Sequence, residues 1–327
     1  MRRREFITTL GGAAAWPLAA RAQQTAIPVV GLLHGGTPEA FAGRIVAFRK
    51  GLSEAGFVED RNVTIEYRWA SNDFKRLPEL AAELVSRGVA VIAVPGAGSG
   101  SVLAAKAATT TIPIVFSTGA DPVQLGYVAS LNRPGGNVTG INDMNSVLTP
   151  KRFSIMSELL PRATRFALLI DQTSANADSI IGEIKAAAVA ANRQIEIAYA
   201  ATSREIDVSF TSLGERHTEA LLVHTNPLFN DRRIQLITLA AHHRLPTIYP
   251  WREAPEVGGL IFYGTSGTDE YRQVGIYVGR VLKGKKPADL PVMRATKFEL
   301  VINLQTARTL GIEVPPSLLA VADDVIE

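Results

Sequence analysis

The chain of 327 residues contains no cysteine. This absence excludes disulfides, thiolate zinc sites and cysteine nucleophiles, so the fold has to be held by its hydrophobic core. None of the five histidines forms an H-E-x-x-H motif or another i, i+4 pair suited to zinc. A G-x-S-x-G motif, typical of serine hydrolases, is also missing. The sequence therefore offers no recognisable catalytic or metal-binding set, and we expect neither an enzyme nor a cofactor requirement.

An excess of charge of one sign is missing as well, once the N-terminus is set aside. The full chain has 34 Lys+Arg and 31 Asp+Glu. Residues 1–22 hold four arginines and one glutamate, which leaves 30 basic and 30 acidic residues in the remainder. A nucleic-acid-binding domain needs a basic face. We therefore expect no nucleic-acid partner.

The first 22 residues, MRRREFITTLGGAAAWPLAARA, have the three parts of a bacterial signal peptide. A basic start is followed by an uncharged run from Thr8 to Ala20 and by an A-x-A cleavage site that ends at Ala22. The order R-R-x-F-I in the basic start points to the twin-arginine export route. The apolar run is shorter than the roughly twenty residues that span a bilayer, and no cysteine follows it for a lipid anchor. We expect a soluble periplasmic protein that is not lipid-anchored.

Short apolar runs alternate with helical patterns in the first half of the remaining chain. Strands are predicted at residues 27–33, 63–69, 89–94 and 114–116, and helices at residues 38–55, 77–87 and 99–109. Strands that alternate with helices at this spacing indicate a parallel sheet with helices on both faces.

The second half of the chain repeats this plan. The runs IPVVGLL, RNVTIEY, VAVIAVPG and TIPIVFS are echoed by RFALLID, RQIEIAY, TEALLVHTN and RLPTIYP, at offsets between about 129 and 138 residues. We therefore predict an α/β protein with two similar doubly wound parallel-sheet lobes. The stretch LNRPGGNVTG at residues 131–140 lies between them and is interpreted as a hinge or crossover. Closure about a hinge would trap a ligand between the lobes.

Four longer stretches resemble a known family. They are AAKAATTTIPIVFSTGADPVQLGYVASLNRPGGNVTG at residues 104–140, IYPWREAPEVGGLIFYG at 248–264, YRQVGIYVGRVLKGKKPADLPV at 271–292 and TKFELVINLQTARTLGIEVPPSLLA at 296–320. In these stretches the chain is similar to the tryptophan/tyrosine-type substrate-binding proteins of bacterial ABC importers, a branch of the type I periplasmic binding proteins. The resemblance covers essentially the whole chain after the signal peptide.

The resemblance implies a hinge-closing periplasmic receptor that hands a small molecule to an ABC permease and its ATPase. The ligand it implies is an amino acid, possibly aromatic, or a related carboxylate, and we expect a monomer. It also implies three chain crossings, with lobe 1 at residues 23–141, lobe 2 at 142–265, a return to lobe 1 at 266–295 and a C-terminal segment at 296–327 that crosses to lobe 2. The alternatives are an exported ligand sensor and an enzyme on a two-lobed α/β fold.

Loops at the predicted strand ends supply the candidate ligand-binding residues, because doubly wound sheets bind ligands there. In lobe 1 the candidates are His34, Gly35, Thr37, Gly98, Ser99, Ser117, Gly119 and Asp121. In lobe 2 they are Asp171, Asn176, Asn226, Phe229, Tyr249, Trp251 and Glu253.

A zwitterionic ligand would need three kinds of partner from this set. Donors for its carboxylate would come from Gly98, Ser99, Ser117 and Gly119, a carboxylate for its ammonium from Glu253 or Asp171, and an apolar wall from Phe229, Tyr249 and Trp251. Ser99 and Asp121 could equally be helix N-caps, and for Asp121 capping is the preferred interpretation. If Glu253 and Asp171 are engaged in structural pairs, an aromatic acid without an amine becomes the better ligand.

Overall fold

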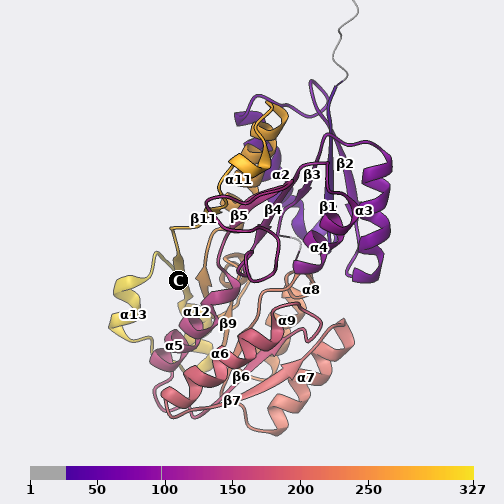
Figure 1. Cartoon of the computed structure of the whole chain (residues 1–327). Helices are drawn as coiled ribbons and strands as arrows, with labels where there is room; N and C mark the ends of the chain where they lie inside the picture. Colours follow the sequence, from indigo (N-terminus) through magenta and orange to yellow (C-terminus); the bar gives the residue numbers. More distant parts are fainter. Residues whose placement is uncertain (1–26, 97) are drawn as a thin grey trace, which may run out of the picture.

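The computed structural model describes residues 27–96 and 98–327, so the signal peptide expected at residues 1–22 lies outside the described residues. The described chain forms two α/β lobes, with one sheet in each, drawn one above the other in Figure 1. Among the described residues, no helix is both long and apolar enough to cross a membrane.

Lobe 1 contains a six-stranded parallel sheet in the order β11-β5-β4-β3-β1-β2. Its strands are β1 (Val29–His34), β2 (Thr64–Trp69), β3 (Val91–Val94), β4 (Ile114–Thr118), β5 (Val138–Asn142) and β11 (Met293–Arg294). Its helices are α2 (Pro38–Glu54), α3 (Leu77–Ser86), α4 (Ser99–Ala108) and α11 (Gly267–Leu282).

Lobe 2 contains a seven-stranded sheet in the order β13-β12-β10-β9-β8-β6-β7, which is parallel except where β12 runs antiparallel to β10. Its strands are β6 (Arg165–Ile170), β7 (Gln194–Tyr199), β8 (Ala220–Val223), β9 (Thr247–Tyr249), β10 (Ile261–Gly264), β12 (Glu299–Asn303) and β13 (Asp324–Ile326). Its helices are α5 (Thr149–Leu159), α6 (Ala177–Ala190), α7 (Ser203–Glu215), α8 (Pro227–Asp231), α9 (Arg233–His242), α10 (Glu253–Glu256), α12 (Leu304–Leu310) and α13 (Pro316–Val321).

The two sheets share one strand order over five strands. The order β5-β4-β3-β1-β2 in lobe 1 corresponds to β10-β9-β8-β6-β7 in lobe 2. The four repeated sequence runs become the strand pairs β1/β6, β2/β7, β3/β8 and β4/β9. The prediction of two similar doubly wound lobes is therefore confirmed.

Hydrophobic packing covers both faces of each sheet. In lobe 1, α2 and α11 pack on one face, and α3 and α4 pack on the other. In lobe 2, helices α5, α6, α12 and α13 cover one face, while α7 and α9 cover the other. Burial of apolar surface on both faces is the main force that holds such a layered domain together.

The chain passes between the two sheets at residues 143–145, 265–266 and 295–298. Pairing of β11 with β5, and of β12 with β10, brings these three crossings side by side. The interpretation of residues 131–140 as the hinge is wrong, because Val138–Asn142 forms strand β5 inside the lobe 1 sheet. Gly140 is needed there for close packing, since a Cβ atom would lie 2.0 Å from the carbonyl oxygen of Phe116.

Candidate functional site

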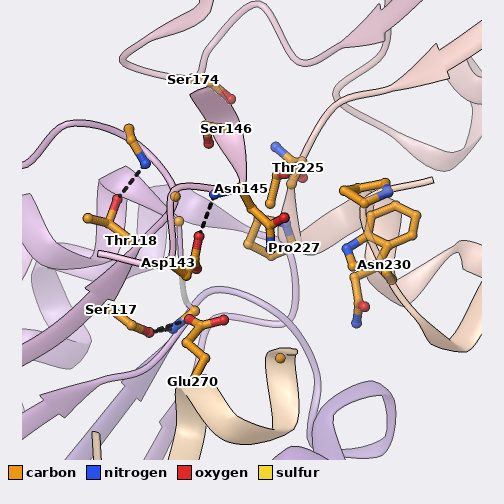
Figure 2. A pocket seen from close by; sticks show the side chains of 18 of the residues that line it. Ser117, Thr118, Asp143, Asn145, Ser146, Ser174, Thr225, Pro227, Asn230 and Glu270 are labelled. Carbon is orange, nitrogen blue, oxygen red and sulfur yellow. Dashed lines mark hydrogen bonds between the residues drawn. The ribbon is translucent and has the colours of Figure 1, made fainter. Parts of the chain in front are cut away.

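A cavity of about 150 Å³ lies between the two lobes and is lined by residues of both. Its wall contains loops that follow β3, β4 and β5 in lobe 1 and β6, β8, β9 and β10 in lobe 2. Figure 2 shows polar side chains of lobe 1, such as Asp143, and of lobe 2, such as Thr225, around this space. A cavity of roughly this size accepts benzene in another protein, so this one suits a small organic molecule.

Seven of the candidates from the sequence line the cavity: Gly98, Ser117, Gly119, Asp171, Asn176, Asn226 and Trp251. Gly98 lies just before α4 with a φ of +79°, which favours glycine. Asn176 lies just before α6. The amino ends of two helices therefore face the cavity, and helix amino ends favour anions. The side chain of Ser99 lies outside what the structure describes.

The other seven candidates do not line the cavity: His34, Gly35, Thr37, Asp121, Phe229, Tyr249 and Glu253. Phe229 and Tyr249 are buried in the hydrophobic core of lobe 2, because the turns after β8 and β9 fold their aromatic rings beneath the cavity wall. Asp121 accepts hydrogen bonds from the N–H groups of Val123 and Gln124 at 2.8 and 3.3 Å, which is the capping alternative.

His34 is a neutral structural residue of lobe 1. Its Nδ1 accepts a hydrogen bond from the N–H of Gly36 at 2.9 Å, so its Nε2 donates to the hydroxyl of Tyr271 at 2.8 Å. Burial and then the positive charge of Arg44 lower the pKa of His34 to about 3. The adjacent Gly35 shares this turn and accepts a backbone hydrogen bond from Asn72 at 2.8 Å.

Thr37 and Glu253 belong to contacts between the lobes. The hydroxyl of Thr37 donates to one carboxylate oxygen of Asp231, and the side-chain amide of Asn72 donates to the other at 2.9 Å. The guanidinium of Arg44 on α2 lies 3.2 Å from both carboxylate oxygens of Glu253 on α10. The structure therefore shows the lobes joined across the cleft, which is the closed arrangement.

The apolar part of the wall comes from both lobes. Phe41 and Phe74 line it in lobe 1, and Pro227, Pro250 and Trp251 line it in lobe 2. Only Trp251 was among the aromatic candidates. Flat apolar side chains on opposite walls suit a planar apolar group.

Two carboxyl groups that the sequence analysis did not single out lie in the wall. Asp143 is 5% exposed and Glu270 is 8% exposed, and both line the cavity. They are hydrogen-bonded to each other. Burial raises the pKa of Asp143, and burial together with the charge of Asp143 raises the pKa of Glu270 well above its usual range. Both residues directly follow strand-like runs, VTGIN and LIFYG, and this position was the available signal.

The crossings beside these carboxyl groups are held rigidly by Arg152. The buried guanidinium donates to the carbonyl oxygens of Tyr263 and Asn145 at 2.7 and 2.9 Å and to Oδ1 of Asn145 at 2.8 Å. Asn145 in turn donates to the hydroxyl of Thr265 at 2.9 Å. Burial lowers the pKa of Arg152 to about 9. The first two crossings are thereby tied to each other.

Two buried polar atoms of lobe 2 have no hydrogen-bond partner within the described part of the chain. They are Oγ1 of Thr225 and Nδ2 of Asn230. Both residues line the cavity, and Figure 2 labels both beside Pro227. An unsatisfied buried polar atom is costly, so these two atoms are suited to a polar ligand. Across residues 27–96 and 98–327, no cluster of three or more acidic or histidine side chains could hold a metal ion.

Two similar α/β lobes joined across an enclosed polar and aromatic cavity define a binding protein of the clamshell type. Comparison with family models matches residues 34–326 to the ABC transporter substrate binding protein family. The match spans most of the chain, and the chain belongs to this family.

Individual relatives agree with this assignment. A protein of Clostridioides difficile (strain R20291) named "Tyrosine-binding protein" is 27% identical over 273 residues, which is 81% of this chain and 76% of that protein. A Streptococcus pneumonia ABC domain solved in complex with L-Trp is 25% identical, with a TM-score of 0.83 over 92% of this chain and 100% of that one. A conserved domain protein from Vibrio cholerae is 25% identical, with a TM-score of 0.84 over 91% of this chain and 99% of that one.

Proposed function

We propose that this protein is a periplasmic receptor that closes around a small amino acid with an aromatic side chain and delivers it to an ABC importer. The observation that carries the proposal is the enclosed cavity between the lobes, whose wall combines apolar and polar groups. Its partners are the permease and ATPase of that importer. Residues 23–141 and 266–295 act as one lobe, residues 142–265 and 296–327 act as the other, and the receptor acts as a monomer.

The wall of the cavity supports an aromatic amino acid. Phe41, Phe74 and Trp251 provide surfaces for a ring. The amino ends of α4 and α6 provide donors for a carboxylate. The relatives named for tyrosine binding or solved with L-Trp belong to the same kind of receptor.

Ligand binding can be tested by a thermal-shift screen of the purified chain without its signal peptide. The panel contains the amino acids, aromatic acids without an amine, sugars and nucleosides. We expect L-Trp or L-Tyr to raise the melting temperature, since ligand at about a hundred times its Kd adds about 2.7 kcal/mol of stability. A shift with a sugar and with none of the amino acids or aromatic acids would overturn the proposal. Chemical turnover of the bound compound during long incubation would favour an enzyme instead.

Export can be tested separately. We propose that the first 22 residues direct the folded protein through the twin-arginine route. Replacing Arg3 and Arg4 together by lysine should leave the precursor in the cytoplasm, since the paired arginines define this signal. Cell fractionation with an antibody against the chain would measure this. Equal periplasmic amounts of both forms would contradict the twin-arginine assignment.

A further inference from the structure

The carboxyl groups of Asp143 and Glu270 lie at two of the three places where the chain passes between the lobes. Asp143 directly follows β5 and begins the first crossing, and Glu270 lies in the first turn of α11, just after the second crossing. Both are buried, both line the cavity, and they hydrogen-bond to each other. Figure 2 shows Glu270 with the hydroxyl of Ser117, and Asp143 with Asn145, on one side of the cavity.

The hydrogen-bond donors around the pair satisfy only part of it. The hydroxyl of Ser117 donates to Glu270 and itself accepts a hydrogen bond from the N–H of Gly96 at 2.6 Å. The N–H of Asn145 donates to Asp143 at 2.7 Å. Among the described residues, neither carboxyl group takes part in an ion pair. The pair is thus held in place without a cation of its own.

The nearby cations are already engaged. Arg44 contacts both carboxylate oxygens of Glu253 at 3.2 Å. Arg152 donates to Asn145 and to the carbonyl oxygen of Tyr263. Two carboxyl groups that share a buried site cannot both ionise at ordinary cost. The empty, closed cavity therefore favours a pair that retains a proton.

The two carboxylates expected to bind an ammonium are engaged elsewhere. Glu253 is paired with Arg44. Asp171 accepts hydrogen bonds from the N–H and the hydroxyl of Thr173, at 2.8 and 2.7 Å, and from the side-chain amide of Asn226 at 3.0 Å. Among the acidic side chains that line the cavity, the pair of Asp143 and Glu270 is the one that lacks a cationic or multiple-donor environment.

From this arrangement we propose that the carboxyl groups of Asp143 and Glu270 form the seat for the protonated amine of the ligand. The inference rests on the proposed function and names the group by which the ligand is selected. The incoming ammonium takes the place of the shared proton, which leaves to solvent, so the site becomes an ion pair with both carboxylates. Because the seat lies on two crossings between the lobes, it contacts the amine only when the lobes are closed.

The test compares ligands that differ only by the amine, using isothermal titration calorimetry on the purified mature chain. L-Trp and L-Tyr are set against 3-(indol-3-yl)propanoate and 3-(4-hydroxyphenyl)propanoate. We expect loss of the amine to weaken binding by about a hundredfold or more, because one side of a buried charge pair is then missing. Binding of the amino acids should release a proton, and their affinity should rise with pH until the pair is ionised in the free protein. Equal affinity with and without the amine would overturn the inference but leave the receptor function standing.

Variants separate an amine seat from a purely structural pair. Asp143→Asn and Glu270→Gln should weaken binding of the amino acid by about a hundredfold while leaving the amine-free acid bound as before, or more tightly. Proton release should be absent in Glu270→Gln. The control is Glu66→Gln, whose carboxylate pairs with Arg68 and Arg87 on β2, outside the cavity, and whose affinities should be unchanged.

Each remaining outcome has a defined meaning. If the two variants lose both ligands to the same extent, the pair supports the fold rather than the amine, and the inference is wrong. The comparison of ligands on the unaltered protein needs no variant, so it decides the matter even where a variant fails to fold. If no member of the panel binds, the proposed ligand class fails and the amine seat fails with it.

Discussion

Arg44 and Glu253 face each other across the cleft, with the guanidinium of one lobe 3.2 Å from both carboxylate oxygens of the other. Burial acts to lower the pKa of Arg44, but the carboxylate of Glu253 and its neighbours outweigh it and raise the pKa. Burial likewise acts to raise the pKa of Glu253, and Arg44 outweighs it, so the pKa lies below its usual value. Each residue thus favours the charged form of the other, and the pair favours closure.

The contribution of this pair to closure can be measured with a double-mutant cycle. We expect Arg44→Gln and Glu253→Gln each to weaken ligand binding, and the two together to weaken it by less than their sum. The coupling should be about 1 kcal/mol, because Glu253 is partly exposed and exposed pairs contribute little. Small-angle scattering should show that the ligand-free variants are more open than the unaltered protein. Strict additivity in the cycle would contradict a direct interaction.

The pH dependence of stability follows from Glu270. Its pKa is raised by burial and by Asp143, so the folded protein retains a proton that the unfolded chain has already lost. Between the usual carboxyl pKa and the raised value, the unfolded state binds fewer protons, and the free energy of unfolding therefore falls as pH rises. Urea unfolding of the ligand-free protein at several pH values should show this decline.

Glu270→Gln supplies the comparison for that measurement, because its side chain has no proton to lose. The variant should show a flatter profile over the same interval and should exceed the unaltered protein in stability at its alkaline end. Glu253 acts in the opposite direction, since its lowered pKa gives stability that is lost as pH falls. It is present in both proteins, so the difference between their profiles isolates Glu270. Parallel profiles would show that Glu270 titrates normally.

Much of the fold could be predicted because it depends on local pattern. Buried parallel strands appear as short apolar runs, and the repeat of four such runs gave the correspondence between β1–β4 and β6–β9. Strand β5 was missed because proline and two glycines precede it and a third glycine lies inside it. Gly140 looked like a sign of flexibility, whereas the structure uses it for close contact with Phe116.

The site could be predicted only in part, for a related reason. Strand ends mark positions such as Ser117 and Asp171, and these line the cavity. Pairing is different, because it depends on the relative placement of the lobes. Neither the engagement of Glu253 by Arg44 nor the contact between Asp143 and Glu270 has a local signature, since each joins residues far apart in the chain.

The unpartnered amide of Asn230 predicts a variant that is more stable but binds less well. Nδ2 of Asn230 is buried without a partner in the described chain, so Asn230→Leu removes an unsatisfied donor. We expect stability to stay equal or to rise by about 1 kcal/mol, and ligand affinity to fall about tenfold. Ser157→Ala is the matched control, because its hydroxyl is also buried without a described partner but lies on α5, outside the cavity. Unchanged affinity in Asn230→Leu would show that the amide does not contact the ligand.

The packing of α11 on α2 predicts opposite effects for two glycine-to-alanine changes. A Cβ atom on Gly275 of α11 would lie 2.2 Å from the carbonyl oxygen of Phe48, so the two helices would have to separate. Gly182 of α6 has no atom within 4 Å of its Cβ position. Helix propensity alone would favour alanine at both sites by about 1 kcal/mol. We expect Gly182→Ala to show this gain, whereas Gly275→Ala should lose about 1–3 kcal/mol through overpacking. Because α11 carries Glu270, Gly275→Ala should also weaken ligand binding. Urea unfolding and calorimetry of both variants would measure these effects, and a Gly275→Ala protein as stable as Gly182→Ala would show that the two helices are not in close contact.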